Sequence, residues 1–182
     1  MENTFEAKPY TGKTAFEQWV KFEGIPMIRD FIVPDLNSLA LHSWDRMGAA
    51  GSWLVLGAPE DQLSMAAYVC EIAPGKSTKP QRHLFEELIF VLSGSGATTV
   101  GNDRTKSASF EWKRGSLFSP PLNVWHQHFN GSGSEAVRYV AMANAPALFN
   151  MFHSYDFIMN KSYRFYDRIR GRRPGSPGDV RR

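Results

Sequence analysis

The middle of the sequence is divided into short apolar segments that recur at intervals of roughly ten residues. Clusters of Gly, Pro, Asn and Ser separate these segments, as is typical of β-strands joined by tight turns. We predict nine strands, at residues 39–44, 52–56, 65–72, 88–92, 97–101, 107–112, 116–119, 124–129 and 136–143. No long helical pattern alternates with them. The sequence therefore favours an all-β barrel or sandwich over a doubly wound fold.

The segments on either side of these strands have a different pattern. Residues 14–24 predict a short amphipathic helix, whose apolar surface would comprise Phe16, Trp19, Val20 and Phe22. Residues 146–169 are rich in aromatic side chains and predict a helical or irregular flap packed on the barrel. The chain is thus expected to comprise an N-terminal extension (1–38), a barrel (39–145), this flap (146–169) and a flexible basic tail (170–182).

Composition excludes several classes of protein. A chain of 182 residues with 42% hydrophobic residues can build one core, so disorder of the whole chain is excluded. No run of about 18 apolar residues predicts a membrane helix, and the first residues do not resemble a secretory signal. Cys70 is the single cysteine, so no disulfide framework is expected and a cytoplasmic location is the default.

The net charge of +3 is unevenly distributed. Residues 161–182 hold eight basic and two acidic residues, whereas residues 1–160 hold 13 basic and 16 acidic residues. The body of the chain is therefore slightly acidic, and its basic end predicts a solvated tail. With no helix-turn-helix pattern beside it, we do not expect nucleic acid to be a partner.

Two segments carry the residues that could do chemistry. Gln81, His83 and Glu87 have the same parity, so an extended backbone would direct all three to one face. His126 and His128 also share a face, and the intervening hairpins would fold the second segment back near the first. Two imidazoles, a carboxylate and an amide oxygen could then converge inside the barrel. Such a set suits a divalent transition metal.

These segments resemble the two motifs of the cupin superfamily. The first motif is Gly, five residues, His-x-His, three or four residues, Glu, six residues and Gly. It is matched by Gly75, Gln81, His83, Glu87 and Gly94, with Gln81 where the first histidine is usual. The second motif is matched by Gly115, Pro121, His126 and Asn130, with Asn123 where glycine is usual. Asn tolerates the left-handed backbone of that turn better than most residues.

The resemblance covers residues 40–145 and implies a double-stranded β-helix, or jelly-roll barrel, with a metal between its sheets. The implied metal ligands are Gln81, His83, Glu87 and His126. Gln81 either binds the metal through its carbonyl oxygen, as Gln-x-His does in phosphomannose isomerases, or forms hydrogen bonds beside it. Fe²⁺ is the favoured ion, with Mn²⁺, Ni²⁺ or Zn²⁺ as alternatives. A homodimer built by the N-terminal extension is also implied.

The candidate catalytic side chains are His128, Tyr68 and Tyr139. His128 could replace Gln81 as a ligand, act as a general base, hydrogen-bond the substrate, or be a satisfied interior histidine. Parity places Tyr68, Cys70 and Tyr139 on the inner face, where Tyr68 either packs in the core or contacts substrate. Arg82 and Glu86 are expected to point outward.

The leading hypothesis is a metal-dependent enzyme whose ion chelates a small, oxygen-rich, anionic organic substrate. Two imidazoles and one carboxylate are typical of non-haem iron chemistry, which makes an oxygen-dependent dioxygenase the first choice. The alternatives are an isomerase, decarboxylase or lyase that uses no O₂, and a non-catalytic cupin that binds a small molecule.

Overall fold

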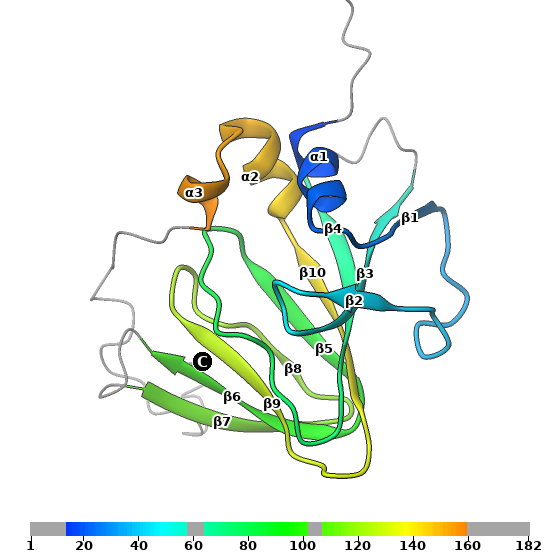
Figure 1. Cartoon of the computed structure of the whole chain (residues 1–182), viewed down its shortest axis with the longest axis vertical. Coiled ribbons are helices and arrows are strands. Elements are labelled where there is room, and N and C mark those ends of the chain that lie inside the picture. The colour runs from blue at the N-terminus through cyan, green and yellow to red at the C-terminus, as the bar shows by residue number, and fades with distance from the viewer. Residues whose placement is uncertain (1–13, 58–63, 102–106, 160–182) are drawn as a thin grey trace, which may run out of the picture.

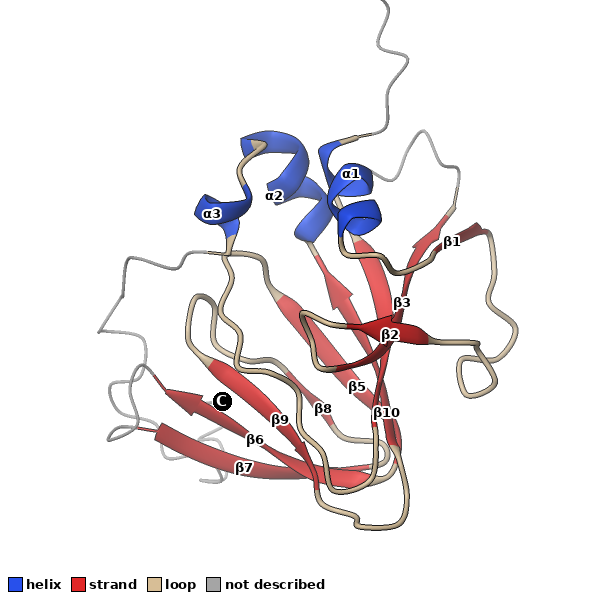
Figure 2. Ribbon diagram, in the orientation of Figure 1, coloured by secondary structure: helices blue, strands red, loops and turns tan. Residues whose placement is uncertain are grey.

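The computed structural model describes residues 14–57, 64–101 and 107–159, which form two β-sheets and three short helices (Figures 1 and 2). The larger sheet has seven strands in the order β1-β3-β4-β10-β5-β8, with β2 paired to β3, and the smaller has the order β7-β6-β9. The strands are β1 (Met27–Asp30), β2 (His42–Trp44), β3 (Ala49–Leu56), β4 (Ala66–Ile72), β5 (Glu87–Ser93), β6 (Ser95–Gly101), β7 (Ser107–Lys113), β8 (Leu117–Phe118), β9 (His126–Asn130) and β10 (Val137–Ala143). The all-β double-sheet architecture that the sequence predicts is therefore correct.

Alternation of side chains along the strands forms the core between the sheets. In β10, Val137, Tyr139, Ala141 and Ala143 are buried, and this strand pairs in antiparallel fashion with both β4 and β5. β9 alternates in the same way, because His126, His128 and Asn130 are buried while the residues between them are half-buried. Buried and less buried residues alternate along these strands, and this alternation is the pattern from which the sequence predicts them.

The three helices gather at one end of the sheets (Figure 1). They are α1 (Ala15–Phe22), α2 (Ala145–Phe152) and α3 (Tyr155–Ile158). Thr14 and Glu17 form a capping box at the start of α1, which satisfies its first backbone N–H groups. The Trp19 ring stacks on Phe149 of α2 at 4.2 Å, and both side chains belong to the main hydrophobic core. Helix α1 thus packs firmly on α2 and the barrel.

The observed elements depart from expectation at two places in the first part of the chain. Phe22 does not belong to the buried face of α1, because 82% of its surface is exposed. Strand β1 was not anticipated, since Pro26 and Pro34 flank a segment that alternates poorly and is half-buried or exposed. It pairs in parallel with β3. The pattern of a short segment does not predict pairing with a strand so distant in the sequence.

The expected flap is helical over α2 and α3, and its residues 160–169, like the predicted tail at 170–182, lie outside the described residues. Among the residues described, none of the helices has the length and apolar character that crossing a membrane requires.

Gly96 offers a sharp test of the packing between β6 and its neighbours. A Cβ at this position would overlap the Phe129 carbonyl oxygen and the Trp112 ring. We expect Gly96→Ala to lower the free energy of unfolding by about 2–3 kcal/mol, because neither backbone nor indole can withdraw cheaply. Urea denaturation measures the loss. Gly133→Ala is the matched control, since a Cβ there meets nothing within 4 Å. Equal stability of the two variants would contradict the observed strand pairing.

Candidate metal centre

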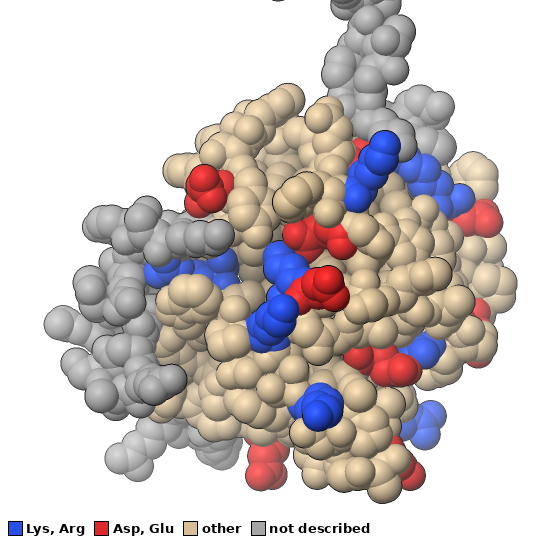
Figure 3. Space-filling view, in the orientation of Figure 1, with Lys and Arg blue, Asp and Glu red and all other residues tan. Residues whose placement is uncertain are grey.

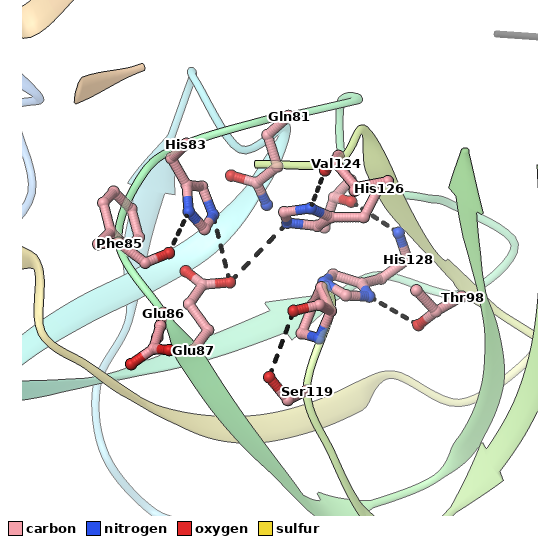
Figure 4. A network of polar contacts seen from close by, with 12 residues as sticks. Gln81, His83, Phe85, Glu86, Glu87, Thr98, Ser119, Val124, His126 and His128 are labelled. Atoms are coloured by element: carbon pink, nitrogen blue, oxygen red, sulfur yellow. Dashed lines mark hydrogen bonds and ion pairs between the residues drawn. The ribbon is translucent and has the colours of Figure 1, made fainter. Parts of the chain in front are cut away.

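The candidate residues meet between the two sheets. Glu87 opens β5 of the larger sheet, His126 and His128 lie on β9 of the smaller one, and Gln81 and His83 lie on the connection between β4 and β5. Gln81 and His126 form an isolated antiparallel bridge, with reciprocal backbone hydrogen bonds of 3.0 and 2.9 Å. This bridge brings the first motif alongside the second. Figure 4 shows the side chains that converge there.

Three of these side chains form a compact group. The potential ligand atoms of His83, Glu87 and His126 all lie within 4.8 Å of one another. Glu87 Oε2 is 3.4 Å from His83 Nε2 and 3.8 Å from His126 Nε2. The exposed fraction of each residue is 4% or less. Within the described chain, these are the residues that come together with the spacing a metal ion requires.

Backbone carbonyls determine which ring nitrogen of each histidine faces the others. His83 Nδ1 lies 2.8 Å from the Phe85 carbonyl oxygen, and His126 Nδ1 lies 3.0 Å from that of Val124. A carbonyl oxygen only accepts hydrogen bonds, so each Nδ1 carries the proton. The Nε2 lone pairs of both rings are consequently directed at Glu87. This arrangement is the usual way in which a protein prepares histidine for a metal.

The charges in the group also suit a cation. Burial alone would raise the pKa of Glu87, but His83 and His126 beside it and a hydrogen bond from Tyr68 hold that pKa at about 2. Burial lowers the pKa of His126 to about 3, an effect that neighbouring His83 reinforces. At neutral pH the group is therefore an ionised carboxylate with a neutral His126 imidazole. Those are the protonation states in which these side chains bind metal.

The group has unsatisfied polar atoms where a metal would be coordinated. Among the buried side-chain atoms without a hydrogen-bond partner are His83 Nε2, His126 Nε2 and Glu87 Oε2. Three buried acceptors that face one another raise the free energy of the folded protein, because no donor proton lies between them. Two imidazole nitrogens and a carboxylate oxygen fit Fe²⁺, Mn²⁺, Ni²⁺ or Zn²⁺. The residues present therefore fit a divalent ion.

Gln81 and His128 lie beside this group with other partners. Gln81 Oε1 accepts a hydrogen bond of 3.0 Å from Arg46, and Gln81 Nε2 is buried without a partner. His128 Nδ1 lies 2.8 Å from the Thr98 hydroxyl, and its ring centre is 5.6 Å from that of His126. Burial lowers the pKa of His128 to about 4.

The two tyrosines proposed as catalytic are both fully buried on the inner face, as parity predicted. The Tyr68 hydroxyl donates a 2.9 Å hydrogen bond to Glu87 Oε1, so Tyr68 orients the carboxylate. The Tyr139 ring lies 5.6 Å from the His128 ring. Burial raises the pKa of each tyrosine well above its usual range, so both remain protonated. Burial also raises the pKa of Cys70 to about 12, so this thiol is not reactive.

Arg82 is placed differently from the sequence-based expectation. Glu86 is exposed as predicted, but Arg82 is only 2% exposed and its guanidinium lies 5.1 Å from the Trp125 ring centre. The prediction assumed an extended strand from residue 81 onward. The chain instead leaves extended structure after the bridge at Gln81, so alternation of side chains does not continue to Arg82.

Sequence reasoning did not identify several residues that surround the group. Arg46 lies in the turn between β2 and β3, and Thr98 and Trp112 lie on β6 and β7. No local motif marks any of them. For Thr98 the signal is its register, since it pairs directly with His128 across β6 and β9.

Comparison with known proteins finds similarity to cupins. Residues 68–142 match the family model described as "Cupin domain". Auxin-binding protein 1 from Arabidopsis thaliana is 27% identical over an alignment of 143 residues, which covers 76% of this chain and 69% of that protein. These matches support a cupin domain over residues 68–142.

Two solved structures share the fold. The cupin domain of Schizosaccharomyces pombe Cnp3 aligns with a TM-score of 0.51 and 22% identity, over 65% of this chain and 77% of that one. The polyketide cyclase RemF from Streptomyces resistomycificus aligns with a TM-score of 0.51 and 21% identity, over 63% and 79%. At these identities the similarity concerns the fold alone.

The buried histidines predict how the metal-free protein responds to acid. His126 and His128 have pKa values of about 3 and 4 in the folded chain, against 6.5 without burial. The unfolded chain therefore takes up protons that the folded chain does not. Unfolding free energy should be constant above pH 6.5 and should fall by roughly 1.4 kcal/mol per pH unit per histidine between pH 6.5 and 4.

Urea denaturation in EDTA at several pH values measures this slope. His128→Gln should reduce the slope by roughly 1.4 kcal/mol per pH unit, because it removes one of the two histidines whose pKa is lowered in the folded chain. His42→Gln is the control, since His42 is exposed on β2. A flat stability profile between pH 7 and 5 would contradict the neutral, buried state of these rings.

Proposed function

We propose that this protein is a metal-dependent cupin enzyme that binds a small, oxygen-rich organic anion and reacts it with O₂ as a dioxygenase. The observation that carries the proposal is the buried group of His83, Glu87 and His126, with two imidazole lone pairs and one carboxylate oxygen directed together. Two histidines and one carboxylate that leave coordination positions open are the ligand set of non-haem Fe²⁺ oxygenases.

Each protein group has a defined task in this proposal. His83, Glu87 and His126 would hold the ion, with Fe²⁺ favoured and Mn²⁺, Ni²⁺ or Zn²⁺ as alternatives. When bound, the ion would supply the positive charge that chelates two substrate oxygens and, as Fe²⁺, the electrons for reaction with O₂. The carbonyls of Phe85 and Val124 fix the imidazoles, and Tyr68 fixes the carboxylate. The buried setting excludes bulk water and strengthens these electrostatic interactions.

The charge distribution supports an anionic substrate at the metal rather than a polyanion on the surface. A divalent ion with one carboxylate ligand keeps a net charge near +1, although residues 1–160 are slightly acidic. On the face shown in Figure 3, basic and acidic side chains are interspersed. Long-range attraction to nucleic acid needs a patch of a single sign, which this face does not present.

A second candidate function is binding without turnover. The similarity to a protein named for binding auxin favours it, because the match spans most of both chains. In that case the same three ligands would hold an ion that retains a small organic anion. An isomerase, decarboxylase or lyase that needs no O₂ would use the same site.

Iron binding tests the proposed centre directly. Wild-type protein loaded anaerobically with Fe²⁺ should bind one equivalent and form a nitric oxide adduct with the electron paramagnetic signal of high-spin iron. His83→Ala should weaken Fe²⁺ binding at least about 100-fold, because a coordinate bond is lost. His42→Ala, a substitution of an exposed histidine on β2, should leave both measurements unchanged.

Oxygen consumption then separates the candidate functions. With a panel of keto acids, enediols and catechols, the iron-loaded protein should consume O₂ and His83→Ala should not. Turnover of such a compound without O₂ uptake would favour an isomerase, decarboxylase or lyase. Saturable binding without turnover would favour the binding module, and wild-type protein without metal affinity would contradict all of them.

We also propose a homodimer, through the outer face of β5, β8 and β10 rather than through the N-terminal extension implied by the resemblance, because α1 of that extension packs on its own barrel. Leu88 and Phe90 are each 39% exposed there, and they pair with Met142 and Leu117, which are 42% and 58% exposed. A continuous apolar area on a sheet face is typical of an interface. Phe90→Glu should convert a dimer to monomer in sedimentation equilibrium, whereas Phe22→Glu on α1 should not. A monomeric wild-type protein would contradict this interface.

A further inference from the structure

The hydroxyl of Thr98 determines which nitrogen of His128 carries the proton. Thr98 Oγ1 accepts a 2.8 Å hydrogen bond from the Trp112 indole N–H and lies 2.8 Å from His128 Nδ1. Thr98 is fully buried. If His128 Nδ1 also donated to this oxygen, the Thr98 hydroxyl proton would have no acceptor among the described residues. The satisfied arrangement has Thr98 donating to Nδ1, which leaves the imidazole proton on Nε2.

His128 is therefore in the opposite tautomer to its two neighbours. His83 and His126 donate from Nδ1 to carbonyl oxygens and present Nε2 lone pairs. His128 presents an Nε2–H group, which is buried without a partner. An N–H group has no lone pair for a metal. The difference follows from what lies behind each ring, a carbonyl oxygen in two cases and a hydroxyl in the third.

Arg46 fixes the Gln81 amide in a similar way. A guanidinium only donates hydrogen bonds, so the Gln81 atom that lies 3.0 Å from Arg46 must be the amide oxygen. Its NH₂ group then turns toward the imidazoles of His83 and His126, where Gln81 Nε2 is buried without a partner (Figure 4). Because the oxygen is engaged by Arg46, the amide offers the site a donor rather than a ligand.

The position of Arg46 is itself determined by the N-terminal extension. Its Nε donates to Glu23 Oε2 at 2.5 Å, and its guanidinium packs over the Trp19 and Trp44 rings at 5.4 and 5.0 Å. Glu23 caps the C-terminal end of α1, and the same oxygen accepts a hydrogen bond from the Trp44 indole. Helix α1 is thereby linked through Glu23 and Arg46 to the orientation of Gln81.

We propose that Gln81 and His128 are two N–H donors that bind an anionic oxygen of the substrate beside a three-ligand metal centre. This inference rests on the proposed function, since it places the substrate next to the ion. Two buried donors and a cation select a carboxylate or enolate oxygen. They disfavour an amine or any other group that would itself need an acceptor. Arg46 and Glu23 are positioning residues that keep the amide turned this way.

The tautomers can be observed directly. In Zn²⁺-loaded protein labelled with ¹⁵N-histidine, two-bond nitrogen–proton correlations distinguish the protonated ring nitrogen of each histidine. We expect the proton on Nε2 for His128 and on Nδ1 for His83 and His126. Thr98→Ser keeps the hydroxyl and should leave the His128 pattern unchanged. A proton on His128 Nδ1 in the wild-type protein would overturn the inference for His128.

The donor role of Gln81 is tested with Co²⁺ and acetate as probes, read from the visible spectrum of the bound cobalt. Gln81→Met preserves length and removes the amide. It should leave the Co²⁺ dissociation constant within about threefold of wild type and weaken acetate binding roughly tenfold, the effect expected for a lost hydrogen bond to a charged group. Gln127→Met is the matched control on β9, because Gln127 has the opposite parity and bonds to Ser77 and Thr78. It should change neither constant.

The contribution of Arg46 is tested by a double-mutant cycle. Arg46→Met frees the amide to rotate, so it should weaken acetate binding, and adding Gln81→Met should cause little further loss. Additive losses would show that Arg46 does not act through Gln81 and would overturn its positioning role. His128→Phe should likewise retain Co²⁺ and weaken acetate binding.

The outcomes separate this inference from the proposed function. A loss of Co²⁺ affinity of about 30-fold or more in Gln81→Met or His128→Phe would make that residue a metal ligand and overturn its donor role. Unchanged acetate affinity would also overturn that role, while the three-ligand centre would stand. If wild-type protein binds neither Co²⁺ nor Zn²⁺, the proposed metal centre fails, and the donor pair fails with it.

Discussion

The backbone bridge between Gln81 and His126 is the contact on which the arrangement of the site depends. Its two hydrogen bonds attach the connection after β4 to β9 of the smaller sheet. The neighbouring bridge between Ser77 and Phe129 and the hydrogen bond from Thr78 N–H to the His128 carbonyl hold the same connection against β9. The bridge also ends the extended run, so the chain can turn and place His83 between the sheets. A short ladder of backbone hydrogen bonds, with the Gln81–His126 pair at the site itself, thus brings the two motifs together.

The polar interior is stable because each ring has a partner behind it. The carbonyls of Phe85 and Val124 accept from His83 and His126, Thr98 contacts His128, and Tyr68 donates to Glu87. These bonds offset part of the cost of burying polar groups. They also leave a set of unsatisfied atoms pointing in one direction. These unpaired atoms still raise the free energy of the folded chain, and a bound cation and anion would lower it by pairing with them.

The sequence predicts the strands other than β1 and most of the inward side chains, because both follow a period of two. His126, His128, Tyr68 and Tyr139 are all buried as parity requires. The same rule misplaced Arg82, where the extended backbone ends, and missed β1, whose partner β3 lies more than twenty residues away. The turn at Asn123 does have the left-handed backbone expected of a glycine substitute, with φ at 60°.

The parts of the site that could not be predicted depend on contacts between distant segments. Nothing near Gln81 in the sequence indicates that its amide oxygen meets an arginine 35 residues earlier. Nothing near His128 indicates a threonine 30 residues earlier behind the ring. A motif specifies which residue types reach the interior, but the atom behind each side chain determines whether it presents a lone pair or a proton. In this protein that second determinant comes from α1, the β2–β3 turn and β6, outside the two motifs. Two proteins can therefore share the same residues at a site and still present different donor and acceptor atoms there.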